Sequence, residues 1–124
     1  SKKDKFEIQD KIFLINNEPL FFYYENKLVP TLKLILKNNF LKKITIDMGA
    51  VPYAAKGADM MRPGITKIDD EIEKDQVVSI VDMTHNKPLA IGLTMFSGEE
   101  IKEMDKGKVV KNIHHIGDDI WNFV

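Results

Sequence analysis

Two short apolar segments, QVVSIVDMT at 76–84 and KPLAIGLTMF at 87–96, constrain the fold more than any other part of the chain. Both are rich in residues that favour strands, and His85-Asn86 between them is a tight polar turn, so they predict neighbouring β-strands. No apolar run approaches the roughly 20 residues that a transmembrane helix needs. We therefore expect a globular domain built on short strands, with no membrane span.

The stretch before these strands predicts a smaller unit. EIQDKIFLINNEPLFFYYENKLVP at 7–30 is typical of a β-hairpin whose turn is Asn16-Asn17-Glu18-Pro19. PTLKLILKNNF then predicts a short helix that has Pro30 in its first turn and stops at Asn38-Asn39. A boundary between two units is expected at residues 41–43.

The second unit alternates strands with short helices. LKKITID is expected to be a strand, and MGAVPYAAKG a short helix with Gly57 as its C-cap. Ser97 begins another helix, which Gly107 ends, and KVVKNIHHIGDDIWNF closes the chain as one or two strands. The core of this unit is predicted to contain Val77, Ile80, Leu89, Ile91 and Trp121.

The chain has a net charge of −1, distributed unevenly. Residues 1–46 carry 9 lysines against 5 acidic residues, whereas residues 47–124 carry 9 basic against 14 acidic residues. A charge so close to zero gives no support for non-specific nucleic-acid binding, so such binding requires a local patch. The acidic stretch 69–75 is expected to be a solvated loop face that repels RNA.

Neither a metal site nor a catalytic site is expected. Cysteine is absent, which excludes disulfides and thiolate ligands and fits a reducing cytoplasm. His114 and His115 are adjacent, so on a strand they point to opposite faces and cannot bind one ion. We expect one half-buried and one surface histidine, and no cofactor. Ser79 and Ser97 lie in no recognisable nucleophile elbow, so the chain is not expected to be an enzyme.

The segment KGADMMRPGI at 56–65 has features suited to an anion. Gly57 and Ala58 leave the backbone unobstructed, which opens their amides to a phosphate. Arg62, the only arginine in the chain, is a forked donor that matches phosphate geometry, and Lys56 adds a point charge. The alternative is a tight helix-to-strand connection, turned by Pro63-Gly64, that binds nothing.

Two longer stretches resemble a known family. ITIDMGAVPYAAKGADMMRPGI at 44–65, with the two strands and GKVVKNIHHIGDDIW, resembles the PUA domain, named for pseudouridine synthases and archaeosine transglycosylases. NNEPLFFYYENKLVPTLKLILKNNF resembles the pre-PUA region of the malignant T-cell amplified sequence (MCT) proteins and their archaeal relatives. The resemblance implies an α+β fold, with a pre-PUA hairpin–helix unit at 1–43, incomplete at its N-terminus, and a PUA pseudobarrel with two short helices at 44–124.

The resemblance also implies a function. PUA domains grip RNA with the first helix, the glycine-rich loop and the next strand, and the pseudouridine synthase catalytic domain is absent here. The MCT branch implies a cytoplasmic role in translation initiation or recycling on the small ribosomal subunit, with rRNA or the tRNA acceptor end as the RNA. A module that docks a translation factor through a sheet edge or the aromatic hairpin is the alternative.

Site residues follow from this resemblance. Lys56, Arg62 and the amides of residues 57–59 would contact phosphates, while Tyr53 and Met60 would contact an unstacked base. Lys42 and Lys43 would extend the positive strip towards the N-terminal unit. The full predicted set is Lys43, Tyr53, Lys56, Gly57, Ala58, Asp59, Met60, Arg62, Pro63 and Gly64.

Overall fold

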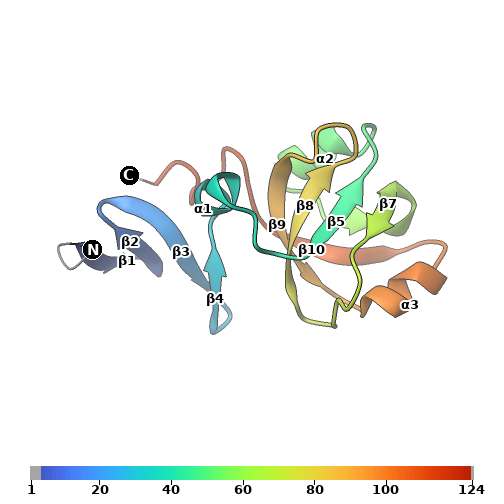
Figure 1. Ribbon diagram of the computed structural model, residues 1–124, viewed down its shortest axis with the longest axis horizontal. Coiled ribbons are helices and arrows are strands. Elements are labelled where there is room, and N and C mark those ends of the chain that lie inside the picture. The colour runs from blue at the N-terminus through green and yellow to red at the C-terminus, as the bar shows by residue number, and fades with distance from the viewer. Residues whose placement is uncertain (1–3, 124) are drawn as a thin grey trace.

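A computed structural model describes residues 4–123, which form two sheets. The N-terminal sheet has four strands in the order β1-β2-β3-β4, and the second sheet has six in the order β6-β10-β9-β8-β5-β7. The two sheets lie side by side, and helix α1 (Leu32–Lys37) sits between them (Figure 1). This arrangement confirms the predicted α+β class.

The N-terminal sheet is a meander rather than a single hairpin. Its strands are β1 (Phe6–Gln9), β2 (Ile12–Ile15), β3 (Glu18–Tyr24) and β4 (Lys27–Pro30). Each tight turn contains two residues with positive φ, namely Asp10-Lys11, Asn16-Asn17 and Glu25-Asn26. Two consecutive left-handed residues are what a type I′ hairpin turn requires. The prediction was correct for the central turn, except that Glu18 and Pro19 belong to β3.

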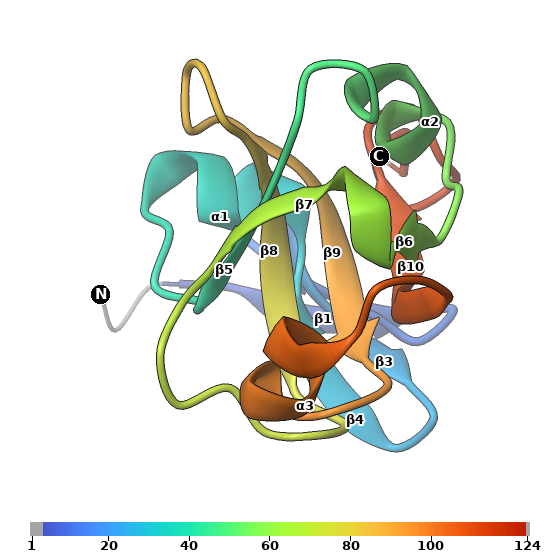
Figure 2. The ribbon, with the colours of Figure 1, turned by 90° about the vertical axis from the view of Figure 1, so that its right-hand side faces the viewer.

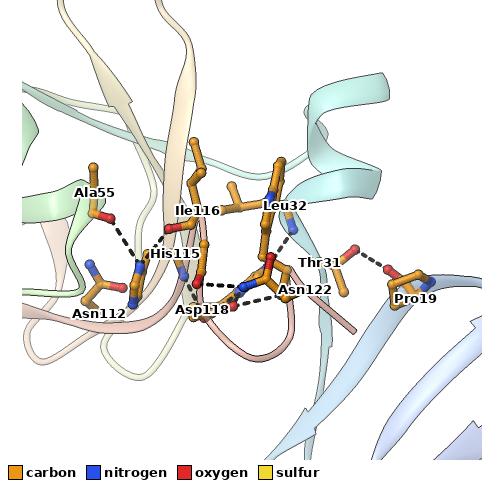
Figure 3. Close-up of polar contacts among 12 residues, drawn as sticks. Pro19, Thr31, Leu32, Ala55, Asn112, His115, Ile116, Asp118 and Asn122 are labelled. Carbon is orange, nitrogen blue, oxygen red and sulfur yellow. Dashed lines mark hydrogen bonds and ion pairs between the residues drawn. The ribbon is translucent and has the colours of Figure 1, made fainter. Parts of the chain in front are cut away.

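Helix α1 is anchored at its first turn. The Thr31 hydroxyl accepts a hydrogen bond from the Leu34 amide at 3.3 Å and donates one to the Pro19 carbonyl at 2.7 Å (Figure 3). Thr31 is thus an N-cap that also joins the helix to β3. Pro30 ends β4 instead of entering the helix, and Asn38 is the C-cap, as expected.

The second sheet is a nearly closed barrel. Its elements are β5 (Lys43–Ile46), α2 (Val51–Ala55), β6 (Met60–Met61), the 3-10 helix η1 (Arg62–Gly64), β7 (Ile65–Ile68), β8 (Val77–Asp82), β9 (Pro88–Thr94), α3 (Gly98–Glu103) and β10 (Lys108–His115). Strands β5 and β8 are parallel, and the other neighbours are antiparallel. Helices α2 and α3 lie at opposite ends of the barrel (Figure 2). The PUA-type pseudobarrel predicted from the sequence is confirmed.

The buried side chains form two clusters instead of one barrel core. Ile80 and Leu89 lie in the barrel as predicted. Ile91 belongs to a second cluster between the barrel, α1 and the N-terminal sheet, and Val77 and Trp121 are partly buried against that cluster. The prediction that these three fill the barrel was wrong, because it assumed that the N-terminal unit and the barrel have separate cores.

A buried histidine lies in this second cluster. His114 is 1% exposed, its Nε2 accepts a hydrogen bond from the Leu32 amide at 3.1 Å, and its Nδ1 lies 2.8 Å from an Asp118 carboxylate oxygen. Because Nε2 accepts from an amide, the ring proton is placed on Nδ1, which faces Asp118. The expectation of one half-buried and one surface histidine was wrong, since His114 is fully buried and His115 is half-buried.

Asp118 is held in its ionised form at this junction. Burial raises the pKa of Asp118, but hydrogen bonds from the His114 ring and from the amides of Trp121 and His115 outweigh it, so the net pKa is below its ordinary value. The carboxylate thereby orders the turn that follows β10 and brings Trp121 against α1, where Lys33 Nζ lies 5.3 Å from its ring centroid.

Candidate nucleic-acid interface

Helix α2 presents an aromatic ring and a cation to solvent. An Asp47 carboxylate oxygen accepts a hydrogen bond from the Ala50 amide at 2.9 Å, which shapes the turn before the helix. Ala54 is fully buried against the barrel, so this helix face is fixed. Tyr53 is 66% exposed, and Lys56 is also exposed. Both predicted contacts are therefore accessible on one short, rigid element.

Gly57 is a glycine for a structural reason. Its φ is +95°, which L side chains rarely adopt, and a Cβ at this position would lie 2.7 Å from Nε2 of His115. The His115 ring is itself held, because its Nδ1 lies 3.1 Å from the Ala55 carbonyl and 3.0 Å from that of Ile116 (Figure 3). Packing against the His115 imidazole is therefore enough to explain why position 57 has no side chain, whether or not a ligand binds the loop.

Two of the predicted phosphate donors are already used. The Gly57 amide donates to the Ala54 carbonyl at 3.1 Å, and the Ala58 amide donates to the Tyr53 carbonyl at 3.0 Å. Both bonds close the C-terminus of α2. Within residues 4–123, no hydrogen bond is made by the Asp59 amide, so it is the one main-chain donor of the predicted three that is not used in closing the loop.

Asn112 fixes the loop, and sequence reasoning missed it. Its Nδ2 donates to the carbonyls of Ala54 and Ala58, each at 3.0 Å, while its backbone amide donates to an Asp59 carboxylate oxygen at 2.8 Å. The Asn112 Oδ1 is buried without a partner among the described residues. Because one side chain ties the helix to the loop, the loop is held in one shape. No local motif marked this asparagine, which lies more than 50 positions away in the sequence.

Two further lysines join the site from β10. Lys108 Nζ lies 3.1 Å from an Asp59 carboxylate oxygen, and Lys111 Nζ lies 5.4 Å from the Tyr24 ring centroid. The contact with Tyr24, assisted by nearby acidic groups that include Asp59, raises the pKa of Lys111. Lys108 and Lys111 are exposed and both interact with Asp59, and the exposed Lys56 lies three positions before Asp59 in the chain; these three lysines are called the basic strip below.

Met60 does not fit the role predicted for it. It is 3% exposed and belongs to the barrel core, so it cannot contact a base. Met61, the next residue, is 50% exposed on the same short strand. Side chains alternate across a strand, so Met61 is the exposed member of this pair.

Arg62 is engaged inside the fold. Its Nε donates to the Ile101 carbonyl at 2.7 Å, and its Nη1 donates to the Ile65 carbonyl at 3.1 Å. The half-buried guanidinium therefore ties η1 to the end of α3. Arg62 also lines a small cleft of about 190 Å³, together with Lys67 and Lys102. Arg62 keeps some capacity for a phosphate, but much of its fork is occupied.

The remaining predicted residues divide between two regions. Pro63 is exposed, and Gly64 lies against the start of α2, where a Cβ would come 3.2 Å from that of Ala50. Lys42 and Lys43 stand at the far end of β5 from α2. The Lys43 amide donates to an Asp69 carboxylate oxygen at 2.8 Å, so the acidic stretch 69–75 is partly engaged in structure and not only solvated.

Residues 4–123 contain neither a group of side chains suited to a metal ion nor a helix that could span a membrane. In residues 4–123, His, Asp and Glu side chains nowhere gather in a group of three that could hold an ion. Within the same range, each helix is too short or too polar to cross a bilayer.

Comparison with known families and proteins gives clear matches. The PUA domain matches residues 42–116, and the Domain of unknown function (DUF1947) matches residues 2–38. An uncharacterized protein of Methanocaldococcus jannaschii is 45% identical over 114 residues, covering 91% of this chain and 70% of that protein. Translation machinery-associated protein 20 of Schizosaccharomyces pombe is 33% identical over 132 residues, covering 100% and 73%. Malignant T-cell-amplified sequence 1 of Rattus norvegicus is 32% identical over 117 residues, covering 90% and 64%.

Solved structures agree with these matches. A hypothetical protein from Pyrococcus horikoshii superposes with a TM-score of 0.82 at 34% identity, covering 98% of this chain and 80% of that one. A conserved PUA domain protein from Thermoplasma acidophilum superposes with a TM-score of 0.83 at 26% sequence identity, covering 98% of this chain and 82% of that one. A chain of an H/ACA RNP bound to a substrate RNA superposes with a TM-score of 0.62 at 26% sequence identity, covering 80% of this chain and 31% of that one. The chain therefore belongs to the PUA-domain family, and it carries a DUF1947 region before the barrel.

Proposed function

We propose that this chain binds RNA through the α2–β10 face and acts in translation. The observation that carries the proposal is the placement of exposed Tyr53 and Lys56 beside a loop fixed by Asn112 and flanked by Lys108 and Lys111. Lysines bind the phosphate backbone, and an exposed aromatic ring stacks on an unpaired base. This combination suits a structured RNA with a single-stranded end.

The comparisons support the same direction. Two relatives carry the names Translation machinery-associated protein 20 and Malignant T-cell-amplified sequence 1, and one structural neighbour belongs to an RNP bound to a substrate RNA. On this basis we infer that the RNA is the tRNA acceptor end or rRNA, and that the chain works in the cytoplasm with the small ribosomal subunit in initiation or recycling. We also propose that it modifies no RNA.

Within this interface, the residues take graded roles. Tyr53 and the exposed Met61 contact a base, while Lys56, Lys111 and the Asp59 amide contact phosphates. Arg62 contributes only through the donors that the Ile101 and Ile65 carbonyls leave free.

Titration of acceptor-stem RNA at several salt concentrations tests the proposal. Replacing Tyr53 with alanine should cost about 1–3 kcal/mol of affinity through lost stacking. Lys56→Ala should weaken binding and lower the salt slope by about one counterion. Lys74→Ala is the matched control, since Lys74 is an exposed lysine in the loop between β7 and β8. Unchanged binding by folded Tyr53→Ala and Lys56→Ala variants would exclude this face.

One observation favours a second candidate function, the docking of a translation factor. The N-terminal sheet exposes apolar side chains on β1, β3 and β4, including Phe6 at 62%, Ile8 at 59% and Leu28 at 49%. Salt dependence separates the two functions, because phosphate binding weakens steeply with salt whereas apolar docking does not.

A further inference from the structure

Helix α3 borders an apolar groove that the RNA proposal does not use. Phe96, just before the helix, and Met104, just after it, line the groove together with Glu99, Glu100 and Glu103, and its volume is about 590 Å³. Phe96 and Met104 are half-buried against the barrel core, so the floor is fixed. Helix α3 lies at the end of the barrel opposite α2 (Figure 2).

The rim of this groove is negatively charged. The Glu100 carboxylate accepts a hydrogen bond from the Ser97 amide at 3.1 Å, which completes a capping box, and this bond is the main reason that the pKa of Glu100 is lowered. Lys102 forms ion pairs with both Glu99 and Asp70, because its Nζ lies 3.5 Å from a Glu99 carboxylate oxygen and 3.6 Å from an Asp70 carboxylate oxygen. In the part of the chain that the structure describes, no cation lies within ion-pair distance of Glu103.

Two of these carboxylates stand one helical turn apart. Glu99 and Glu103 have i, i+4 spacing, which destabilises a helix by a few tenths of a kcal/mol when the charges are alike. Lys74, on the facing loop, acts on Glu100 and leaves Glu103 unneutralised. The surface around Phe96 and Met104 therefore combines apolar contact area with a negative rim in which Glu103, among the described residues, has no cation partner.

We propose that this α3 groove docks a basic peptide segment of a partner protein, with an apolar side chain seated on Phe96 and Met104 and flanking Lys or Arg residues paired with the rim. Charge complementarity selects this occupant, because the same carboxylates repel RNA phosphates. An apolar anchor inside a charged rim is the arrangement in which a short segment binds specifically. Because helices α2 and α3 lie at opposite ends of the barrel (Figure 2), a peptide in the groove does not cover Tyr53 and Lys56.

Two synthetic peptides test the proposal, Lys-Leu-Arg-Lys-Leu-Arg and its serine counterpart Lys-Ser-Arg-Lys-Ser-Arg. Each is titrated into ¹⁵N-labelled protein at one fixed salt concentration. The leucine peptide should shift the amide signals of residues 96–104 and bind at least tenfold more tightly than the serine peptide. Glu103→Lys should weaken binding at least tenfold. Glu7→Lys is the matched control on β1, far from α3 (Figure 1), and should leave binding unchanged.

Three results would overturn the proposal. Equal binding of the two peptides would reduce the effect to non-specific charge attraction. Unchanged affinity in a folded Glu103→Lys variant would place the peptide elsewhere. Movement of the α3 signals on dilution of the protein alone, or on titration with RNA, would identify a second copy of the chain or a nucleic acid as the occupant.

Discussion

Replacing Gly57 with alanine should destabilise the protein more than the same replacement at Gly107. Both glycines have positive φ, +95° and +99°, so alanine meets a similar backbone strain of about 1–2 kcal/mol at each position. At Gly107 a Cβ has nothing within 4 Å, whereas at Gly57 it would lie 2.7 Å from the His115 imidazole. Overpacking of this kind adds about 1–3 kcal/mol, which is the expected difference between the two variants.

Urea denaturation followed by the fluorescence of Trp121, the only tryptophan, measures this difference. The comparison is well matched, because the loss of unfolded-state entropy from Gly→Ala is the same at both sites. In a His115→Ala background the extra cost at Gly57 should disappear, since the ring is gone. Equal destabilisation of the two single variants would refute the reasoning, because the imidazole would then swing aside from its Ala55 and Ile116 bonds without cost.

Further predictions concern burial and pH. Met60→Ala should cost about 2–5 kcal/mol while Met61→Ala costs less than about 0.5 kcal/mol, by the same denaturation. Trp121→Ala should cost about 1.5–3 kcal/mol, and the loss should fall on the packing between α1 and the C-terminal turn, which hydrogen exchange of α1 amides would detect. Asp82 has its pKa lowered chiefly by the His85 amide, with burial opposing, and hydrogen bonds also lower that of Asp118 against burial. The unfolded state therefore binds more protons in acid, so stability is retained at neutral pH and declines from about pH 5 downwards. Asp82→Asn should flatten that decline in urea titrations at a series of pH values.

The sequence predicted those helix ends that are marked by residues close to them in the chain. Ser97 was read correctly from its neighbours as the start of α3, and Gly57, directly after the C-cap Lys56, marks the end of α2. It did not predict the first and last turns of the N-terminal sheet, because Asp10-Lys11 and Glu25-Asn26 adopt left-handed geometry without a glycine. Their register comes from strand pairing, which no dipeptide signal encodes.

The site shows the same limit at longer range. Tyr53 and Lys56 were predicted from the resemblance of this helix and loop to the PUA domain, and both are exposed. Asn112 and Lys108 reach the loop only because β10 folds alongside β6, with Lys108 paired to Met61. Arg62 was singled out by its chemistry and by the resemblance of its loop to the RNA-gripping loop of PUA domains. A guanidinium donates equally well to phosphates and to backbone carbonyls. Arg62 has a structural role because its Nε lies close to the Ile101 carbonyl, and only the tertiary fold brings these two groups together.

The second hydrophobic cluster joins the N-terminal unit to the barrel and so affects the position of the candidate interface. Ile91 of β9 lies in that cluster with Phe22 of β3, whose ring stands edge-on to His114 with the centroids 5.4 Å apart. His114 in turn accepts the first amide of α1, so one imidazole on β10 contacts both the sheet and the helix of the N-terminal unit. A shared core of this kind resists independent motion of the two units, because sliding would leave the Leu32 amide buried and unbonded. Lys111 lies on the same strand and contacts Tyr24 across the seam. The basic strip is therefore positioned by both units, and a nucleic acid lying along it would contact the barrel and the N-terminal sheet together.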